Sequence, residues 1–579
     1  MRRLIRFGAV VALALGSLAA AAPPTQAAGG SSAQASANAC QLGNGIQHVI
    51  NVVFDNVHLT RDNPNVPSDL EQMPNLLNFI EQNGTMISHN YTPLISHTAD
   101  DIITTLTGLY PDQQGLAVAN SYAYYNPDGT EGGFPSAFQY WTDTIGDGTF
   151  NNVTASGANT PAPWVPFTRA GCNVGGVSTA NIELENNGNI NNVFGAGSPE
   201  SIEASTNPAK ATADFIGIAI HCAQGAALCS TANNGKADPL PSEPGGYNGY
   251  MGLFGHKYVA PAISPSGPLT DLDGNVIQDS HGNVGFPGFG GISASQSLGY
   301  VAAMQEHGVP VTYAYIADAH DNHSGFGAFG PGEAGYEAQL RSYDSAFGKF
   351  FARLAADGIT PKNTLFNFSS DENDHFAGKL LAGCDGVTTP CVYNHANVTG
   401  NIGEITTNMT DLMAKAGVTT NFDLHFDDAP AVYLLPRPGR TDSVTRTFEQ
   451  TAATLVDPNN YVTGQPTPLM QRMADSVEMQ NLHMITGDPN RTPTFIYFGN
   501  PDYFFQTFGS PDFRQSSGFA WNHGDFQPEI VTSWLGLVGP GVQNLGLDDQ
   551  TWATHADTRP TILALTGLHD DYVSEGRVL

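Results

Sequence analysis

The sequence predicts an α/β protein built on a doubly wound, mostly parallel β-sheet that carries a loop-rich insertion. Three observations favour this class. Strand-like apolar segments alternate with helix-like segments near the start of the chain and again from about residue 294. Acidic and histidine residues directly follow several apolar segments, and the carboxyl ends of parallel strands would bring such residues together. The intervening residues 110–290 are rich in Gly, Asn, Ser and Pro and lack a long helical period.

The expected elements alternate along the chain. A strand at 47–54 leads to a helix in PNLLNFIEQNG, and a second helix begins at Thr98 or Ala99 and ends before Gly108. Apolar residues recur every three or four positions over 334–356, which predicts a long helix there. The other expected elements are a helix at 295–307 and strands at 309–317, 363–370, 430–435, 493–498 and 530–538.

The N-terminus has the features of an exported protein. Residues 1–27 have a positive start, an apolar segment and a small-residue cleavage site, as in a secretory signal peptide. Residues 28–45 are small and polar, and we expect them to be disordered. Residues 46–579 are then one catalytic domain with an insertion or cap at about 110–290. We expect a secreted or periplasmic protein without stable membrane insertion, since no later segment resembles a membrane span.

Six cysteines agree with export. Six cysteines allow fifteen connectivities; two pairs are close in sequence, which favours the disulfides Cys222–Cys229, Cys384–Cys391 and, from the remaining residues, Cys40–Cys172. A cysteine-ligated metal is disfavoured because no CxxC spacing occurs.

The chain is strongly acidic. Its formal net charge of −32 becomes −35 once the three arginines of the signal peptide are removed. Such a chain repels nucleic acid and anionic membrane surfaces, so we expect no nucleic-acid partner. Within the insertion, DLDGNVIQDSHGN (271–283) has a glycine at the fourth position, whereas an EF-hand calcium loop needs it at the sixth. We therefore interpret this segment as hairpin turns.

Candidate functional residues follow the predicted strands. Asp55 and Asn56 follow the first strand, and Asp318, Asp371 and Glu372 follow two later ones. A lone strand-end aspartate most often caps a turn, but carboxylates, imidazoles and a hydroxyl that converge in one crevice are what a two-metal hydrolase needs. Thr98 stands at the start of a helix, where the field suits a nucleophile or a bound phosphate. The alternative is that Thr98 only caps this helix, with Asp101 completing a capping box.

Residues 98–108 resemble the nucleophile region of the alkaline phosphatase superfamily, where a Ser or Thr starts a helix that ends in a Thr-Gly or Ser-Gly pair. Asp55-Asn56 and DEND (371–374) are similar to the acid phosphatase and phospholipase C branch of phosphoesterases. GLVGPGV (536–542) and HADTRPTILALTGL (555–568) are similar to the closing strand and helix of the superfamily. The resemblance covers about 47–110 and 295–570.

The resemblance implies two metal sites. Asp55, Thr98 and Asp371 would bind one cation. Asp318, His323 and His523 would bind the other. Two departures leave alternatives open. Four residues separate Asp318 from His323 instead of three, so the ligand could instead be Asp321 or His320. Glu372 stands where a histidine is usual, so the second site is completed by Glu372 or by His375.

The implied activity is that of a phosphoric ester hydrolase. Thr98 would attack phosphate mono- or diesters and form a phosphothreonine, while Asn56 and helix amides hold a non-bridging oxygen. Two divalent cations would assist, with zinc favoured by the resemblance and manganese, iron and calcium also open. Lys257, in the insertion, is a possible phosphate contact, but an ordinary surface lysine is the favoured interpretation.

Two other functions compete with this one. A sulfatase shares the fold but needs a C/S-x-P-x-R motif, which residues 98–101 lack. A secreted binding protein on a degenerate phosphatase scaffold is the second alternative, since fold alone does not determine function. The natural substrate, the choice between mono- and diesters and the oligomeric state stay open.

Overall fold

A computed structural model describes residues 40–116, 162–179, 183–240, 247–320, 327–396, 401–485 and 489–579. The predicted signal peptide and the candidate ligands Asp321 and His323 lie outside these residues, as does most of the segment expected to be disordered. No helix in the described ranges is long and apolar enough to cross a membrane.

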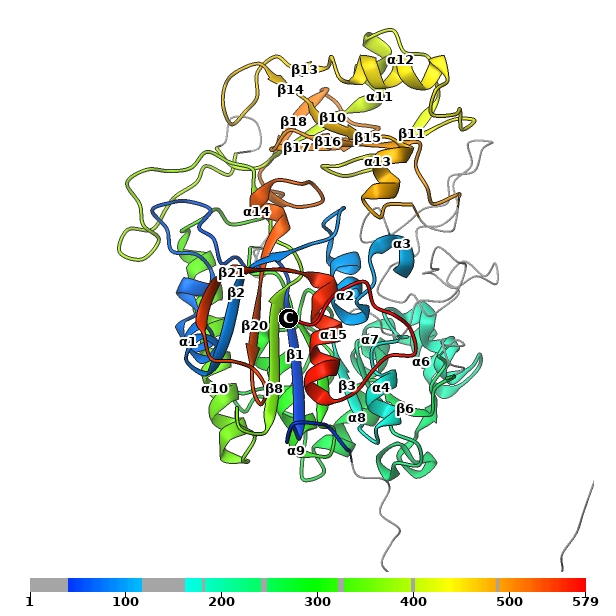
Figure 1. Cartoon of the computed structure of the whole chain (residues 1–579), viewed down its shortest axis with the longest axis vertical. Coiled ribbons are helices and arrows are strands. Elements are labelled where there is room, and N and C mark those ends of the chain that lie inside the picture. Colours follow the sequence, from blue (N-terminus) through cyan, green and yellow to red (C-terminus); the bar gives the residue numbers. More distant parts are fainter. Residues whose placement is uncertain are drawn as a thin grey trace, which may run out of the picture. The chain divides into compact units, whose positions relative to one another are not determined.

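The centre of the fold is a ten-stranded sheet (Figure 1). In spatial order its strands are β21 (Gly546–Thr554), β2 (Gly84–Tyr91), β20 (Thr532–Val538), β8 (Thr364–Ser370), β1 (His48–Phe54), β7 (Val311–Ile316), β3 (Val174–Val177), β4 (Ile218–Cys222), β6 (Met251–Phe254) and β5 (Lys236–Ala237). Strands β21, β2, β8, β1, β7, β3 and β6 run in one direction, and β20, β4 and β5 run in the other. The predicted α/β class is therefore confirmed, with most strands running in one direction. Neighbouring strands are parallel at the centre, from β8 to β3, whereas five of the nine neighbouring pairs are antiparallel, so the sheet is mixed.

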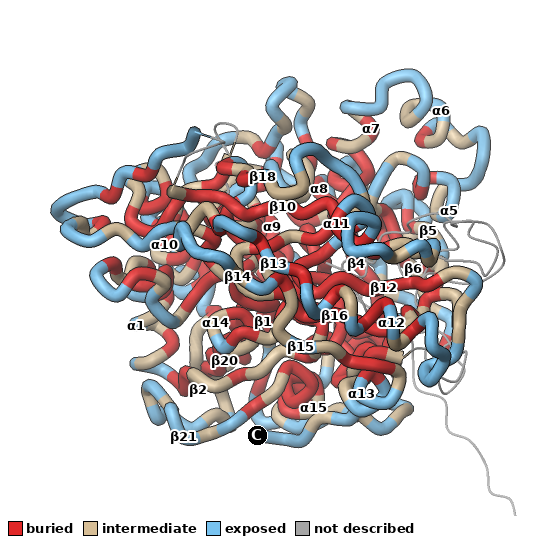
Figure 2. The backbone as a smooth tube through the Cα atoms, turned by 90° about the horizontal axis from the view of Figure 1, so that it is seen from above, coloured by how far each residue is buried: buried red, intermediate tan, exposed pale blue. Residues whose placement is uncertain are grey.

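Helices cover both faces of this sheet. Successive side chains of a strand point to opposite faces, so Ile50, Val52 and Phe54 of β1 pack in one core and Val49 and Val53 in another. The first core includes residues of α1 (Pro74–Asn83), α9 (Ala294–Glu306) and α10 (Ala334–Ala356). The second includes residues of α2 (Thr98–Thr107) and α15 (His555–Thr566). This is the doubly wound arrangement that the alternating sequence predicts, and Figure 2 shows buried residues along β1 and β20.

Two predicted strands belong to a different sheet. The segments 430–435 and 493–498 form β12 (Ala431–Leu434) and β16 (Phe495–Gly499), but these pair with β11 (Phe422–His425) and β15 (Met470–Ala474) in an antiparallel four-stranded sheet. Both predicted strands are present, but apolar segments predict strands without stating their partners, so the sequence did not indicate this separate sheet. A three-stranded sheet of β17 (Tyr503–Gln506), β10 (Glu404–Asn408) and β18 (Phe513–Ser516) is also present.

The remaining elements are short. Two two-stranded sheets pair β13 (Val456–Asp457) with β14 (Thr467–Pro468) and β19 (Trp521–Asn522) with β9 (His375–Phe376). The other α-helices are α3 (Pro111–Gln114), α4 (Val165–Arg169), α5 (Ile190–Phe194), α6 (Pro199–Thr206), α7 (Pro208–Phe215), α8 (His256–Ile263), α11 (Met409–Lys415), α12 (Ser443–Ala452), α13 (Ser476–Asn481) and α14 (Pro528–Val531). Single 3₁₀ turns occur at Leu70–Gln72, Asn187–Asn189, Ala227–Cys229 and Thr231–Asn233.

The described part of residues 110–290 contributes strands to the main sheet. Strand β3 pairs in parallel with β7, and β4, β6 and β5 continue the sheet beyond it. These strands have two to five residues each, too few to give a clear period in the sequence. Isolated bridges join Thr270 to Val276 and Gln278 to Val284, and these support the expected hairpin turns.

Three disulfides join the predicted pairs: Cys40–Cys172, Cys222–Cys229 and Cys384–Cys391. Disulfides of this number are typical of proteins from oxidising, extracellular compartments.

We predict that these disulfides differ in their contribution to stability. The Cys40–Cys172 bond joins residues 132 apart, whereas the Cys384–Cys391 bond joins residues 7 apart. Loop-closure entropy of the unfolded chain then predicts losses of about 5 and about 2.5 kcal/mol when each pair is changed to serine. Denaturant unfolding of Cys40→Ser/Cys172→Ser and Cys384→Ser/Cys391→Ser would measure both. Equal losses would contradict the entropic origin of the difference.

Candidate active site

Three adjacent parallel strands end at the candidate site. Strand β1 lies between β7 and β8, and Phe54 is in register with Ile316 of β7 and Ser370 of β8. The residues that follow these strand ends therefore meet at one edge of the sheet. They include Asp55 after β1, Asp318 after β7, and Asp371 and Glu372 after β8.

Carboxylates crowd together at the ends of β1 and β8. Asp55, Asp371 and Glu372 each offer an oxygen, and these atoms lie within 4.8 Å of one another. The backbone amides of Asn56 and Glu372 donate to Asp371 Oδ1 at 3.1 and 2.9 Å. Asp371 Oδ2 and Glu372 Oε2 are buried without a hydrogen bond to any described residue. Buried oxygens of this kind suit a hard or borderline cation, so the residues fit a metal ion.

The electrostatics of this group agree with its geometry. Burial and the charge of Asp55 raise the pKa of Asp371 well above its usual range. Burial and the charge of Asp371 do the same to the pKa of Glu372. Burial, together with the charge of Asp318, raises the pKa of Asp55 to about 8, although the Tyr315 hydroxyl donates to its carboxylate. A bound cation would remove this mutual repulsion.

Thr98 is the first residue of α2 and points at this carboxylate group. Its hydroxyl donates to Glu372 Oε1 at 2.9 Å. His523 Nε2 lies 3.3 Å from the same oxygen. The N-cap residue is His97, whose side chain makes no capping bond, and Asp101 instead accepts from the Ser96 hydroxyl at 3.2 Å. The capping-box interpretation of Thr98 was therefore wrong.

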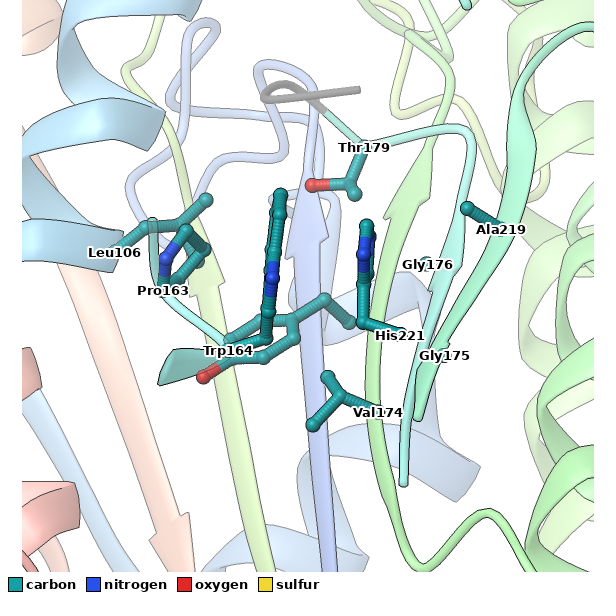
Figure 3. Close-up of a pocket in the computed structure, with 10 residues that line it drawn as sticks. Leu106, Pro163, Trp164, Val174, Gly175, Gly176, Thr179, Ala219 and His221 are labelled. Atoms are coloured by element: carbon teal, nitrogen blue, oxygen red, sulfur yellow. The ribbon is translucent and has the colours of Figure 1, made fainter. Parts of the chain in front are cut away.

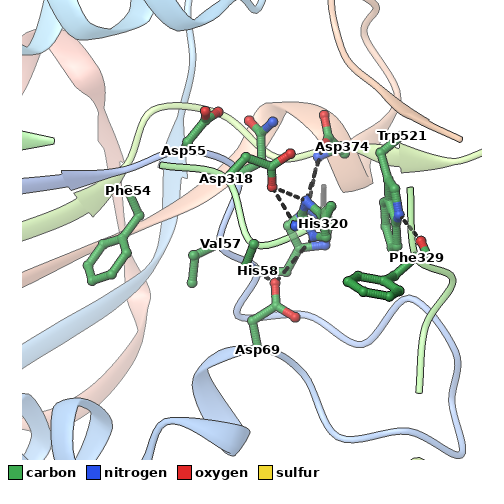
Figure 4. A network of polar contacts seen from close by, with 12 residues as sticks. Phe54, Asp55, Val57, His58, Asp69, Asp318, His320, Phe329, Asp374 and Trp521 are labelled. Carbon is green, nitrogen blue, oxygen red and sulfur yellow. Dashed lines mark hydrogen bonds and ion pairs between the residues drawn. The ribbon is translucent and has the colours of Figure 1, made fainter. Parts of the chain in front are cut away.

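A second group gathers around His320 (Figure 4). His320 Nδ1 lies 2.9 Å from Asp318 Oδ1 and 3.2 Å from Asp374 Oδ2, and its Nε2 lies 3.5 Å from Asp69 Oδ2. Burial alone would lower the pKa of His320, but the surrounding carboxylates raise it well above its usual value. Asp318, His320 and Asp374 offer atoms close enough to one another to hold a metal ion.

Asp374 connects the two groups. Its Oδ1 lies 2.7 Å from His523 Nδ1, while its Oδ2 faces His320. Burial alone would raise the pKa of Asp374, but hydrogen bonds from the two histidines lower it below the usual range. His523 thus bridges Asp374 and Glu372, and it lies in a segment far along the chain from both.

The structure brings some predicted residues together and leaves others apart. Asp55, Thr98, Asp371, Glu372, His523 and Asp318 all lie in this site. Asn56 has a positive φ of 52° and a buried side-chain oxygen without a hydrogen bond to described residues.

Two other candidate residues have different partners. His375 lies between Asp502 and Glu529, at 3.3 and 3.2 Å. Lys257 pairs with Glu203 and Asp214 at the surface, in agreement with the surface-lysine interpretation and not with a phosphate contact.

Sequence reasoning missed other members of the site. Asp374 was not singled out as a ligand, and Asp69 and His58 were not considered; the His58 ring nitrogen Nε2 accepts from the Asp374 amide at 2.9 Å. Asp427, which follows β11, contacts His97 Nε2 at 2.6 Å, next to the nucleophile candidate. The only signal for Asp374 was its place in the acidic run 371–374. Asp69 and Asp427 have no sequence signal of this kind, because neither directly follows a predicted strand or belongs to a motif.

Comparisons with known proteins give fold-level similarity only. No family model matches the chain, and no curated protein matches it. Among solved structures, the murine ectonucleotide pyrophosphatase/phosphodiesterase 5 is 13% identical, with a TM-score of 0.49, and the match covers 92% of this chain and 97% of that one. An inactive variant of the murine protein in complex with AMP gives the same values. The human protein is 12% identical over the same shares, with a TM-score of 0.47.

We predict that the metal-free protein loses stability as the pH rises from about 4 to about 8. The folded-state pKa of Asp55 lies near 8, above the ordinary value of 3.8, so Asp55 holds its proton where the unfolded chain has lost it. Its contribution is complete below pH 3.8 and is lost as the pH approaches 8. Denaturant unfolding in the presence of chelator should show a flatter pH dependence for Asp55→Asn.

Asp549→Asn is the matched control, because Asp549 is an exposed carboxylate on β21. This variant should keep the wild-type pH dependence. Equal slopes in Asp55→Asn and the wild type would contradict a proton held by Asp55 in the folded state.

Proposed function

We propose that this protein is an exported, metal-dependent phosphoesterase of the alkaline phosphatase superfamily with Thr98 as its nucleophile. The observation that carries the proposal is the hydrogen bond from the Thr98 hydroxyl to Glu372, beside Asp55 and Asp371. A helix-initiating hydroxyl next to a cation-binding group is suited to attack on phosphorus. The motifs that resemble this superfamily include the same residues.

Two groups of side chains would hold the cations. The first consists of Asp55, Asp371, Glu372 and the Thr98 hydroxyl oxygen. The second consists of Asp318, His320 and Asp374, with His523 placed between the two groups. Oxygen and imidazole donors without thiolate suit zinc or manganese, and the oxygen-only first group also suits harder ions. Bound cations would lower the hydroxyl pKa and neutralise charge on the phosphate.

Each step of the proposed reaction is assigned to particular residues of the chain. Glu372 orients the Thr98 hydroxyl and accepts its proton as the Thr98 oxygen bonds to phosphorus. The bond from phosphorus to the leaving oxygen breaks, and that oxygen takes up a proton from the solvent. The first amides of α2 and the Asn56 side chain hold a non-bridging oxygen. A water oxygen then bonds to phosphorus and its proton passes to the solvent, while the bond from phosphorus to the Thr98 oxygen breaks and this oxygen regains the proton held by Glu372. His523, 3.3 Å from Glu372, is placed to assist this proton transfer.

The charge of the site favours diesters over monoesters. Among the described residues, no lysine or arginine forms a hydrogen bond or an ion pair with Asp55, Thr98, Asp371, Glu372 or Asp374. A diester carries one negative charge, whereas a monoester carries nearly two at neutral pH. Beside these carboxylates no lysine or arginine of the described residues meets the second charge. We therefore propose that the substrates are phosphate diesters.

The sulfatase alternative has less support, because residues 98–101 lack the modification motif. The binding-protein alternative would require a degenerate site, whereas the hydroxyl and the carboxylates are both present.

We predict that Thr98→Ala lowers the rate of diester hydrolysis by about 10³-fold or more, as expected for loss of a nucleophile. Thr98→Ser should retain part of the activity, because serine supplies the same hydroxyl. Ser96→Ala is the matched control, since the Ser96 hydroxyl bonds to Thr92 and Asp101 rather than to Glu372. Hydrolysis of a chromogenic diester with added zinc or manganese would measure all three. Undiminished activity in Thr98→Ala would sink this assignment.

We also predict a preference of at least about tenfold in kcat/KM for bis(p-nitrophenyl) phosphate over p-nitrophenyl phosphate. At about 4 Å from a carboxylate, an added negative charge costs roughly 1 kcal/mol in bulk water and roughly 4 kcal/mol at a partly shielded site. Both rates are measured on the same metal-loaded protein. A preference for the monoester would show that the cations offset the carboxylate charge completely.

A further inference from the structure

A third group of acidic and histidine side chains lies apart from the candidate active site. It consists of Glu183, which precedes α5, His221 of β4, and Asp238, which follows β5. Val174 of β3 is in register with both His221 and Val311, the first residue of β7. Asp318 of the active site follows the other end of β7. His221 therefore lies level with the N-terminal end of β7, whereas the catalytic residues lie at its C-terminal end.

The three side chains are spaced like the ligands of one ion. His221 Nδ1 lies 2.8 Å from Asp238 Oδ2 and 3.8 Å from Glu183 Oε1. Ligands around a tetrahedral zinc-class ion, with bonds of about 2.0–2.2 Å, are separated by about 3.3–3.6 Å. The observed separations bracket this value. All three residues are buried, with exposed fractions of 1%, 4% and 5% for Glu183, His221 and Asp238.

The carboxylates of this group lack a positive partner of matching charge. Both oxygens of Glu183 and Oδ1 of Asp238 are buried without an N–H or hydroxyl donor among the other described residues, and the two carboxylates interact with each other. No lysine or arginine of the described ranges forms a hydrogen bond or ion pair with either carboxylate. The undescribed segments after residue 39 contain no lysine or arginine. His221 alone can carry a positive charge against two buried carboxylates, which is costly without a further cation or proton.

Trp164 holds the histidine in place. Its ring stacks on His221 with centroids 3.5 Å apart and planes inclined by 8° (Figure 3). The stack covers one face of the imidazole and restricts its rotation, so Nδ1 stays directed at the carboxylates. Support of this kind orients the ligands of protein metal sites. Small and apolar residues, among them Val174, Gly175 and Ala219, line the adjoining cavity of about 20 Å³.

We propose that Glu183, His221 and Asp238 bind a divalent cation of the zinc class, separate from the catalytic ions. The ion would take one carboxylate oxygen from Glu183, one from Asp238 and the Nδ1 lone pair of neutral His221. It would join three segments at the β4–β6–β5 edge of the main sheet, which gives it a structural role.

Cobalt(II) titration of the mature, chelator-treated protein tests the site through Trp164 fluorescence. Cobalt bound to His221 would lie next to the Trp164 ring and quench its emission. We expect saturable quenching in the wild type, of which one component is lost in Trp164→Phe and in Glu183→Gln/Asp238→Asn. The other component arises from cobalt at the catalytic groups, where Trp521 stacks on His320, and it is retained in these variants. Asp371→Asn is the matched control, because it removes a catalytic ligand and should keep the component that depends on Trp164. Quenching that is the same in the wild type and in Trp164→Phe would overturn the proposal.

Metal content, measured by mass spectrometry after zinc loading and desalting, gives an independent result. Glu183→Gln/Asp238→Asn should hold about one ion fewer per chain than the wild type and should keep its diester hydrolysis and its circular dichroism. Equal metal content in the two proteins would mean that a shared proton, and not a cation, neutralises the carboxylates. His221→Gln is the second variant if the double variant fails to fold.

Discussion

The repulsion among carboxylates at the ends of β1 and β8 is the constraint on which the rest of the site depends. The parallel pairing of β1 with β8 holds the carboxylates of Asp55, Asp371 and Glu372 within a few ångströms of one another. These residues cannot move apart unless the pairing at the centre of the sheet is broken. Protons or cations must therefore neutralise them. The two backbone amides that donate to Asp371 provide part of this compensation, and they also hold its free oxygen toward the interior. The arrangement is stable only as a binding site for positive charge.

The surrounding fold makes this constraint rigid. Strand β1 is buried on both faces, so its end cannot move away from β7 and β8. The Trp534 indole donates to the carbonyl of Val57 at 2.8 Å, and the Ser370 hydroxyl accepts from the Val57 amide at 3.0 Å. These bonds fix the segment after Asp55. Preorganised side chains of this kind lower the cost of binding a charged ligand, since little has to be ordered when it arrives.

Sequence patterns predict local structure here better than they predict pairing partners. The apolar period of 334–356 coincides with α10, and residues 98–107 form α2, because both signals depend on neighbours along the chain. The segments around β12 and β16 are strands as expected, but their sheet depends on partners far away in sequence. The same distinction holds in the site. Asp55, Asp371 and Glu372 follow strands and are found from the sequence, whereas Asp69 and Asp427 lie in loops that only tertiary packing brings to the histidines.

His523 connects Thr98, the proposed nucleophile, to the second group of Asp318, His320 and Asp374. It contacts Glu372, which accepts the Thr98 hydrogen bond, and Asp374, which also faces His320. A change of charge at Asp318 or His320 therefore reaches Thr98 through a continuous chain of hydrogen bonds and ion pairs. Because each histidine already faces at least one carboxylate, the second group can remain neutralised by protonated imidazoles when the first group alone holds a cation. The charge of each group thus affects the other, but the two groups can bind cations in separate steps. The oxygen-rich group of Asp55, Asp371 and Glu372 carries the greater unmet negative charge.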